Sequence, residues 1–472
     1  MKTSARLSAC RFLVPGGTAM SLTASLRIRL ATTLLALALL LPATVLAAGI
    51  ELQEQDAAAQ ARALAVRAWL LNPSTLFYNP AGLAYLESLS FSVGDTLVFP
   101  NFNYEDPAAV NPKGSNINKV VPPPHAYLTY AREIGFGRLG VGAGVNFPFG
   151  LTLDWGDDFA GRNLVTKSAL SIPEILAGFG YAPIPEVSIG ATFVASPAHV
   201  YLKKFLGKEF GLPADDGIPI EDATVEMSGS GWGFGFNAGI QARPLSWLFL
   251  GINYRSAIHL GLEGNAHFNI DGLSDRSGFP DQKVETAFEL PHIVAAGIGA
   301  RFGSFYTELD LDYTFWSVFE EIPLTFPEDK TGALSQSVPE DWKDGLTVRW
   351  GNEYAVSDQF RVRLGGGYDQ SPATPKYLSP MLPDSDRIFL MAGAGYTFDL
   401  GFSVDLGYGF TYFLPREVSG HACTAADPEC LDADGNLVPY AADGSVNWVG
   451  NRFPALYNNY AQLLTVTLGM TL

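Results

Sequence analysis

The sequence predicts an all-β fold, a transmembrane antiparallel β-barrel of about 14 strands. The chain of 472 residues has only 17% charged residues, against about 25% in typical soluble proteins, and it contains 49 Gly and 19 Tyr. From residue 87 onward, segments in which apolar and polar residues alternate are separated in turn by short and long connections. Because hydrocarbon cannot hydrogen-bond to free backbone groups, a lipid-facing sheet of this kind must close on itself.

Residues 1–47 have the features of a secretory signal peptide. Arg27 and Arg29 precede an apolar run over 30–41, and small residues suited to cleavage follow. Counted from Met20, the leader falls within the usual length of about 15–30 residues, so we expect Met20 to be the true start. A membrane anchor is the alternative, but the run is shorter than the roughly 20 residues that a spanning helix needs. We therefore expect export and cleavage.

The exported chain is expected to be strongly acidic. Removal of the leader takes away five of the 30 basic residues and none of the 48 acidic ones, which leaves 25 basic residues and a net charge of −23. This charge argues against nucleic acid as a partner, since nucleic-acid binding requires a basic surface. Cys423 and Cys430 remain as a close pair in a polar stretch, and we interpret them as a disulfide. A metal site would require more ligands than His421 supplies, so none is expected.

The connections separate the expected strands in a regular way. Short turns such as 302–304 and 399–401 alternate with long loops, and this segregation is typical of outer-membrane barrels and not of soluble sandwiches. The expected strands cover 88–98, 125–133, 138–153, 168–182, 186–202, 222–243, 246–269, 284–302, 305–326, 343–357, 359–371, 386–398, 402–415 and 460–472.

Alternation within the strands assigns side chains to the lipid or to the lumen. In the ninth expected strand, Leu309 and Leu311 alternate with Glu308, Asp310 and Asp312, so the acidic residues should point inward. The charged residues expected in the lumen are Arg255, Glu308, Asp310, Asp312, Arg349, Arg361 and Arg363. Opposite charges on adjacent strands pair across a sheet, so we interpret this set as a salt-bridge network, with a ligand-binding role as the alternative.

Residues 48–86 precede the barrel, which we place at 87–472. They are rich in Ala, and a helix is expected over 56–68. The segment is too long and too apolar for a simple tail, and it has the size of a plug that folds back into the lumen. A plugged barrel does not conduct ions freely, so an open general porin is disfavoured.

Several motifs resemble one known family. The segment 75–84 (TLFYNPAGLA) resembles the N-terminal hatch motif of the FadL family of outer-membrane long-chain fatty acid transporters. Further motifs recur in that family in the same order and at similar spacing, and the resemblance covers essentially the whole mature chain. These motifs are 231–240 (GWGFGFNAGI), 253–256 (NYRS), 289–291 (ELP), 342–344 (WKD), 368–372 (YDQSP) and 383–387 (PDSDR).

The resemblance implies a fold and a function. It implies a fourteen-stranded barrel in the outer membrane, plugged by an N-terminal hatch, that takes up hydrophobic molecules by diffusion with no cofactor and no ATP. The ligand would meet a groove among the extracellular loops, pass to a pocket in the barrel, and leave sideways into the outer-membrane lipid. Such an apolar path keeps a hydrophobic ligand out of water throughout.

The resemblance also assigns residues to parts of this path. The hatch beside the opening would contain Asn79, Pro80 and Ala81. The candidates for the lateral opening, late in the third strand, are Asn146, Phe147, Pro148, Phe149 and Gly150. Since Pro cannot donate to a β-ladder and Gly weakens one, a bulge or gap is also expected here on physical grounds, with a plain strand end as the alternative.

The ligand itself is less well specified. Fatty acid transporters of this family use a basic residue after the fifth strand, and Lys204, between Lys203 and Phe205, meets that requirement. They also use a Lys shortly before the Trp-Lys-Asp-like motif, where this chain has Val338. Ile50, near the new N-terminus, would reach the pocket. We expect long-chain fatty acids as ligands, with aromatic or aliphatic hydrocarbons as the alternative.

The sequence also argues against two other classes of function. An adhesin-like or purely structural barrel would act through its acidic loops, but it would have no need of a hatch beside a strand gap. A lipid hydrolase would need a nucleophile and a base, yet the six histidines are scattered and no serine lies in a recognisable nucleophile motif. We therefore expect no enzymatic activity.

Overall fold

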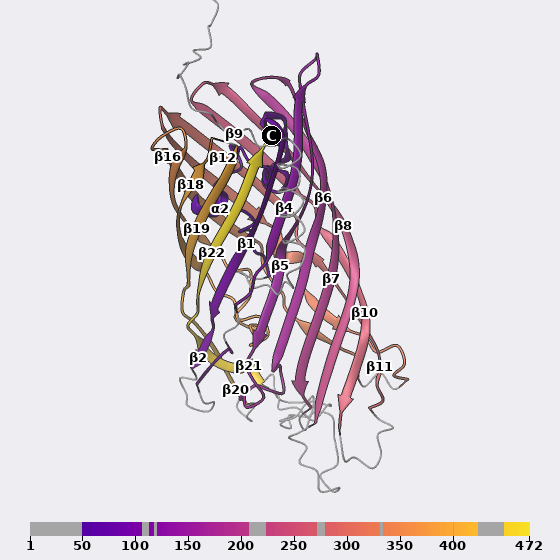
Figure 1. Ribbon diagram of the computed structural model, residues 1–472. Coiled ribbons are helices and arrows are strands. Elements are labelled where there is room, and N and C mark those ends of the chain that lie inside the picture. The colour runs from indigo at the N-terminus through magenta and orange to yellow at the C-terminus, as the bar shows by residue number, and fades with distance from the viewer. Residues whose placement is uncertain are drawn as a thin grey trace, which may run out of the picture.

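The computed structural model is a closed, antiparallel 14-stranded β-barrel, as the sequence predicts (Figure 1). The described residues are 50–105, 113–117, 120–206, 223–270, 279–330, 334–399, 401–422 and 448–472. The predicted signal peptide and the predicted Cys423–Cys430 disulfide lie outside this part of the chain.

Each wall strand pairs with its neighbours in sequence, and β1 pairs with β22 to close the barrel. Two wall strands are interrupted, so that β9 continues into β10 and β11 continues into β12. The wall elements are β1 (Ser88–Asn101), β4 (Pro124–Glu133), β5 (Arg138–Asp154), β6 (Lys167–Ile184), β7 (Val187–Phe205), β8 (Thr224–Leu245), β9 (Leu248–Arg255), β10 (Ile258–Asn269), β11 (Gln282–Leu290), β12 (Ile293–Phe302), β13 (Phe305–Thr314), β16 (Gly345–Ala355), β17 (Phe360–Asp369), β18 (Arg387–Thr397), β19 (Phe402–Phe413) and β22 (Tyr460–Thr471).

The two ends of the barrel differ. Short turns and the C-terminus lie at the upper end in Figure 1, and the strand ends that the longer connections join lie at the lower end. In outer-membrane barrels the short turns are periplasmic and the long loops extracellular, which orients the molecule. The extracellular end carries a small sheet of β2 (Asn103–Glu105), β3 (Gly114–Ser115), β20 (Arg416–Ala422) and β21 (Trp448–Tyr457), which the sequence did not reveal.

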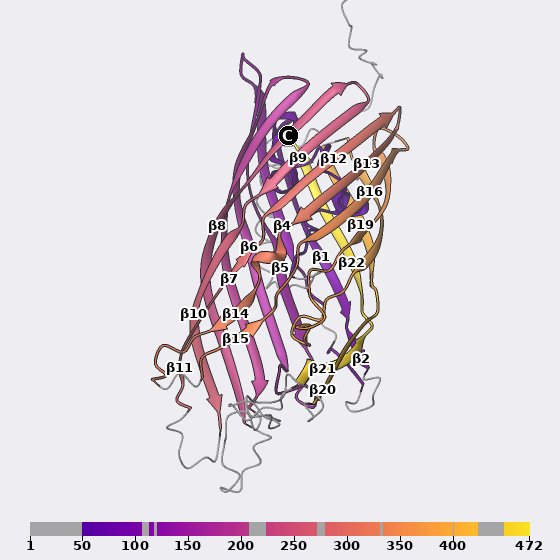
Figure 2. The ribbon, with the colours of Figure 1, turned by 180° about the vertical axis from the view of Figure 1, so that it is seen from behind.

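The ninth expected strand, 305–326, is too long. The wall strand β13 ends at Thr314, a 3₁₀ turn η5 (Trp316–Val318) follows, and β14 (Glu321–Leu324) then pairs with β15 (Gln336–Pro339) in a separate hairpin (Figure 2). The break between β11 and β12 falls at Pro291, which has no N–H to donate to the ladder.

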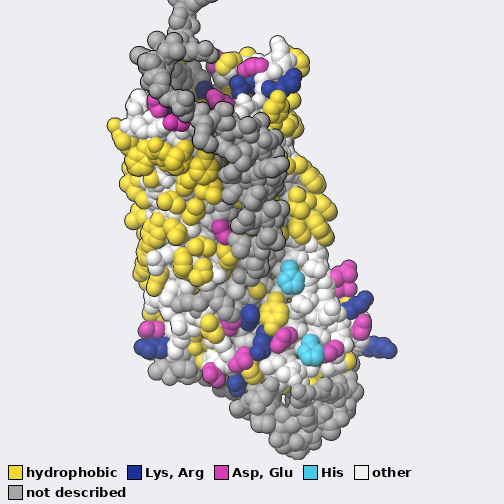
Figure 3. Space-filling model, viewed as in Figure 1, with side chains coloured by type: hydrophobic (Ala, Val, Ile, Leu, Met, Phe, Trp, Pro, Cys, Tyr) yellow, Lys and Arg dark blue, Asp and Glu magenta, His cyan; other side chains and the backbone are white. Residues whose placement is uncertain are grey.

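The outer surface carries the apolar residues of the alternating pattern. Side chains such as Phe234 and Leu390 are exposed at 60% and 64%. In Figure 3, hydrophobic side chains gather between the two ends of the visible face, and charged side chains lie at the upper edge and toward the extracellular end. Among the described residues, no helix is long and apolar enough to cross a membrane.

Residues 50–86 fold inside the barrel as the hatch. They contain α2 (Ala57–Ala61), α3 (Thr75–Tyr78) and the 3₁₀ helix η1 (Pro80–Tyr85), and most of their side chains are buried. The helix expected over 56–68 is in fact only Ala57–Ala61, because Ala63 and Leu64 adopt left-handed backbone angles with φ of 53° and 64°. Gly251 of the wall lets the hatch approach closely, since a Cβ there would lie 2.1 Å from the carbonyl oxygen of Arg67.

Candidate functional site

The acidic row of β13 holds the hatch in the lumen. Glu308 forms a 2.9 Å ion pair with Arg62, and its other oxygen accepts the N–H of Ala68 at 2.6 Å. One oxygen of Asp310 accepts the backbone N–H groups of both Val66 and Arg67, at 2.8 and 3.0 Å. The inward direction of these side chains agrees with the alternation, but their partners are hatch residues and not the neighbouring strands.

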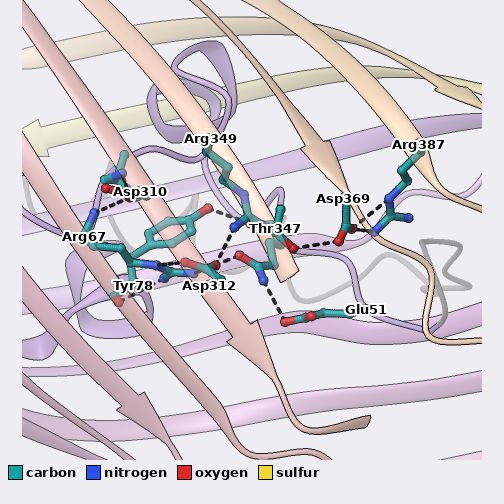
Figure 4. A network of polar contacts seen from close by, with 11 residues as sticks. Glu51, Arg67, Tyr78, Asp310, Asp312, Thr347, Arg349, Asp369 and Arg387 are labelled. Atoms are coloured by element: carbon teal, nitrogen blue, oxygen red, sulfur yellow. Dashed lines mark hydrogen bonds and ion pairs between the residues drawn. The ribbon is translucent and has the colours of Figure 1, made fainter. Parts of the chain in front are cut away.

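Asp312 joins the hatch to the next wall strand. Its Oδ2 lies 2.7 Å from Nη2 of Arg67 and 2.5 Å from Nη1 of Arg349 on β16 (Figure 4). Arg67 also donates to the side chain of Gln53 at 2.9 Å, and Gln53 donates to Glu51 at 2.9 Å. A continuous polar network therefore links β16 and β13 to the N-terminal part of the hatch.

The remaining arginines of the expected lumen network pair within the wall or across the lumen. Arg363 on β17 contacts Glu353 at 2.7 Å and Asp405 at 2.5 Å, and Arg361 lies 3.8 Å from Glu353. The third of these arginines, Arg255 on β9, pairs with Glu174 on β6, a strand that is not its neighbour.

The hatch motif Asn79-Pro80-Ala81 lies against β6 to β9. The Asn79 side chain donates to the carbonyl of Arg67 at 2.8 Å and accepts the N–H of Ala81 at 3.2 Å, so it caps η1. Pro80 packs so closely on Gly190 of β7 that a Cβ at that glycine would lie 2.4 Å from the Pro80 carbonyl carbon. The motif shapes the hatch, and other hatch residues contact the third wall strand at its gap.

The wall has a gap between β4 and β5. Their ladder ends at the pair Ala126–Val145, although β5 continues to Asp154. Beyond this point β6 is the one wall strand among the described residues that pairs with β5, and a bulge between Asn146 and Phe149 shifts the register. A one-residue bulge reverses the facing of the strand, so Leu151 points into the lumen. The five candidates for the lateral opening are therefore brought together at this gap.

Three hatch residues occupy the free edge of β5. Ile50 accepts the N–H of Gly150 at 2.7 Å, and Leu52 donates to the carbonyl of Pro148 at 2.6 Å. The side-chain amide of Gln55 both donates to the carbonyl and accepts the N–H of Phe147, each at 3.0 Å. We call Ile50, Leu52 and Gln55 the seal, because they satisfy backbone groups that β4 leaves free.

Two further side chains close the gap from inside. The amide of Asn146 donates to the hydroxyl of Tyr127 on β4 at 3.1 Å, and that hydroxyl donates to the carbonyl of Gln55 at 3.3 Å. Sequence reasoning missed Leu52, Gln55 and Tyr127. Gln55 stands in the polar run 51–56 (ELQEQD), and Leu and Tyr occur throughout the chain, so nothing in the sequence marks these three residues.

The hatch carries acidic groups in unusual surroundings. Burial raises the pKa of Glu51 to about 7, although Arg255 and Arg349 act in the opposite direction. Burial likewise raises the pKa of Asp56 to about 6, assisted by the nearby carboxylate of Asp405. Both groups lie beside the seal or the helix that follows it, where a carboxylate is poorly solvated.

An apolar cavity of about 110 Å³ lies on the extracellular side of the hatch. Its walls come from β5 to β8, β10, β11 and the β14–β15 hairpin, and they include Leu151, Val200, Leu262, Phe288 and Val338. Ile50 lines it as well, so one residue of the seal touches both the cavity and the gap.

No Lys or Arg lines this cavity among the described residues, and its one charged lining residue, Glu285, has an exposed side chain. Lys204 shares the inward face of β7 with Val200 and Leu202 and is buried, but it does not line the cavity. The alternation places the next two candidates on the other face of β7. Lys203 pairs with Asp157 at 2.9 Å, and Phe205 packs beneath Arg162. Of the four expected ligand-binding residues, only Ile50 lines the cavity.

A second cavity, of about 660 Å³, lies on the periplasmic side of the hatch. It is lined by the charged side chains of Arg62, Arg301, Glu353, Arg363 and Asp405 together with hatch residues. The hatch therefore separates a polar cavity from an apolar one.

Comparison with known proteins decides the family. The family model described as outer membrane protein transport protein (OMPP1/FadL/TodX) matches residues 38–446. The chain belongs to this family. It is therefore an outer-membrane β-barrel of the FadL/TodX family, as the motifs predict.

Individual relatives of this family member are distant. The chain is 25% identical over 365 residues to the long-chain fatty acid transport protein of Escherichia coli K12, covering 71% of this chain and 80% of that protein. It is 27% identical over 399 residues to a 47 kDa outer membrane protein of Pasteurella multocida, covering 80% and 90%.

Solved structures show the same fold. A FadL homologue of Pseudomonas aeruginosa superposes with a TM-score of 0.73 at 18% identity, covering 90% of this chain and 99% of that one. The toluene transporter TodX of P. putida superposes with a TM-score of 0.65 at 15% identity, covering 90% and 98%.

Proposed function

We propose that this protein takes up small, uncharged hydrophobic molecules by passive diffusion across the outer membrane. The observation that carries this proposal is the apolar cavity, whose lining residues include no basic side chain among those described. A bound carboxylate would lack a charge partner there, and burying an unpaired charge is costly. Val338 lines the cavity at the position where fatty acid transporters of the family were expected to have a Lys.

The size of the cavity supports a small ligand. An apolar cavity of about 150 Å³ in another protein accommodates one benzene molecule, and the volume here is about 110 Å³. A compound with one ring, or a short segment of a longer chain, is therefore near the upper limit of what this space accommodates. An entire long-chain fatty acid would require the cavity to enlarge.

The proposed path leads from the cavity through the gap in the wall. Ile50 borders both, so its displacement would connect the cavity to the free edge of β5. Movement of the seal would break the contacts to Phe147, Pro148 and Gly150 and leave a lateral opening toward the outer leaflet. The ligand would then pass from apolar cavity to lipid without entering water.

Long-chain fatty acids are the second candidate, and one observation favours them. Lys204 is buried on the inward face of β7, two residues beyond Leu202, which lines the cavity. A fatty acid could place its chain in an enlarged cavity and its carboxylate near this ammonium group. This arrangement is also consistent with the 25% identity to long-chain fatty acid transport proteins.

Equilibrium binding to the purified protein in mild detergent tests the two candidates. The probes are labelled toluene, a long-chain alkane and the long-chain fatty acid that matches it. We expect saturable binding of toluene that the variant Lys204→Ala leaves unchanged. A clear preference for the fatty acid over the alkane, lost in Lys204→Ala, would favour the second candidate, and binding of none of the three would refute both.

A further inference from the structure

We propose that a row of prolines forms a hinge across three adjacent wall strands, and that the Arg255–Glu174 ion pair latches this hinge in its closed position. The inference rests on the proposed function, because it assigns a device to the same lateral path. The hinge residues are Pro148 on β5, Pro173 on β6 and Pro197 on β7.

The three prolines lie side by side in the wall. The pairs Asn146–Glu174 and Phe149–Ile172 flank the bulge, so Pro148 lies opposite Pro173. The ladder between β6 and β7 runs to the pair Ser171–His199 and resumes at Ile175–Ala195 in the same register.

Pro173 and Pro197 therefore face each other where three consecutive pairs of that ladder are missing. Proline cannot donate to a ladder, so this row is a line of weak hydrogen bonding across the wall. It begins at the gap between β4 and β5 and ends at β7, since the β7–β8 ladder runs through the same level without interruption.

The strands beyond this line form one face of the apolar cavity. Every cavity-lining residue that β5, β6 and β7 contribute, namely Leu151, Ser168, Ala169, Leu170, Val200, Tyr201 and Leu202, lies on the extracellular side of the prolines. The outer parts of β5 and β6 remain paired with each other from Phe149–Ile172 to Asp154–Lys167. Because the outer part of β6 is also paired with β7 from Ser171–His199 to Lys167–Lys203, the outer parts of all three strands would bend outward together about the prolines, with the continuous β7–β8 ladder as the fixed side. This movement would widen the cavity and the gap together.

The latch crosses the lumen at the level of the hinge. Nη2 of Arg255 lies 2.6 Å from Oε1 of Glu174, and both side chains are buried, with exposures of 8% and 0%. Glu174 directly follows Pro173 and lies opposite Asn146 at the bulge. The guanidinium stacks on the ring of Phe77 in the hatch at 4.4 Å and lies 6.0 Å from the ring of Phe149.

The ion pair thus ties the hinge to the hatch and to β9. Because a charge left unpaired in a buried site is costly, opening that separates this pair is resisted for as long as both charges are present. Arg255 and Glu174 are positioning residues, since neither lines the apolar cavity.

Two sets of variants test the hinge and the latch in opposite directions. Glu174→Gln keeps the size of the side chain and removes the charge. We expect release of labelled toluene from the detergent-solubilised protein to be about tenfold faster or more. Pro173→Ala combined with Pro197→Ala supplies the two missing N–H donors, and we expect release to slow severalfold. The matched control is Glu353→Gln, which removes a carboxylate from another interior pair, with Arg363.

Hydrogen exchange followed by mass spectrometry separates a latch from a merely structural role. In Glu174→Gln, exchange should accelerate in peptides from 147–154 and 167–174 and remain unchanged in β16 to β19. Acceleration throughout the barrel, or the same local effect in Glu353→Gln, would overturn the proposal. If the parent protein binds toluene but exchange and release are unaltered in both sets of variants, the hinge is refuted and the proposed function stands. If the parent protein does not bind toluene, the proposed function itself is refuted.

Discussion

Removal of the Asp312 carboxylate should release the hatch. Asp312 pairs at once with Arg67 of the hatch and with Arg349 of the wall, and these two side chains are only 2% and 5% exposed. In the variant Asp312→Asn, two buried guanidinium groups lose their shared anion. Breaking a buried ion pair by removal of one partner costs about 3–5 kcal/mol.

We expect the lower end of this range, because the asparagine oxygen still accepts one hydrogen bond. A cost of about 3 kcal/mol shifts the balance between docked and displaced hatch by roughly a hundredfold. Glu308 and Asp310 would still hold residues 62–68, so displacement should remain partial and transient. The expected result is a low baseline conductance interrupted by brief openings.

Single-channel recording in planar lipid bilayers measures this behaviour directly. The matched control is Asp405→Asn, which removes a carboxylate paired with Arg363 at 2.5 Å and leaves that arginine its second partner, Glu353. Openings in Asp312→Asn that are absent from the parent and from the control are expected. Equal conductance in all three proteins, or equal openings in the two variants, would refute the account of β13 as the anchor of the hatch.

Three further perturbations follow from the site. Gln55→Ala removes both hydrogen bonds to Phe147, each worth about 0.5–1.5 kcal/mol, so ligand release should accelerate. The control Gln60→Ala, elsewhere in the hatch, should release ligand at the parent rate. Val338→Lys should raise the affinity for a long-chain carboxylate about tenfold or more over the matching alkane. Ser337→Lys should not, because the side chain at 337 is on the exposed side of the same strand. Equal effects of the two variants would contradict the assignment of the cavity. Burial raises the pKa of Glu340 to about 8, so the folded protein retains a proton that the unfolded chain loses above about pH 4.5, and stability should fall as pH rises between these two values. Glu340→Gln should abolish that part of the pH dependence in urea unfolding curves, and a result identical to that of Glu321→Gln, on the same hairpin, would show that burial of Glu340 is not its cause.

Much of the barrel is encoded locally. The period-2 alternation in a segment such as 305–314 depends only on whether each side chain meets lipid or lumen, so strand number and side-chain facing can be predicted from the sequence. The irregularity at Pro148 is also local, because a residue without an N–H interrupts any ladder in which it lies. The same local rule predicts an interrupted ladder at Pro173 and at Pro197. Only the register of the strands shows that these two prolines and Pro148 are adjacent in the wall.

The partners across the lumen depend on the tertiary structure alone. Alternation directs Glu308, Asp310 and Asp312 inward, but it cannot show that their partners lie 244 to 246 residues earlier, in the hatch. The strand that was expected to reach residue 326 ends at Thr314, because the segment beyond it pairs with β15 and covers the cavity. A sequence pattern reports the surroundings on each side of a strand. Which groups meet in the lumen is decided by closure of the barrel around the hatch, since closure brings distant segments within hydrogen-bonding distance.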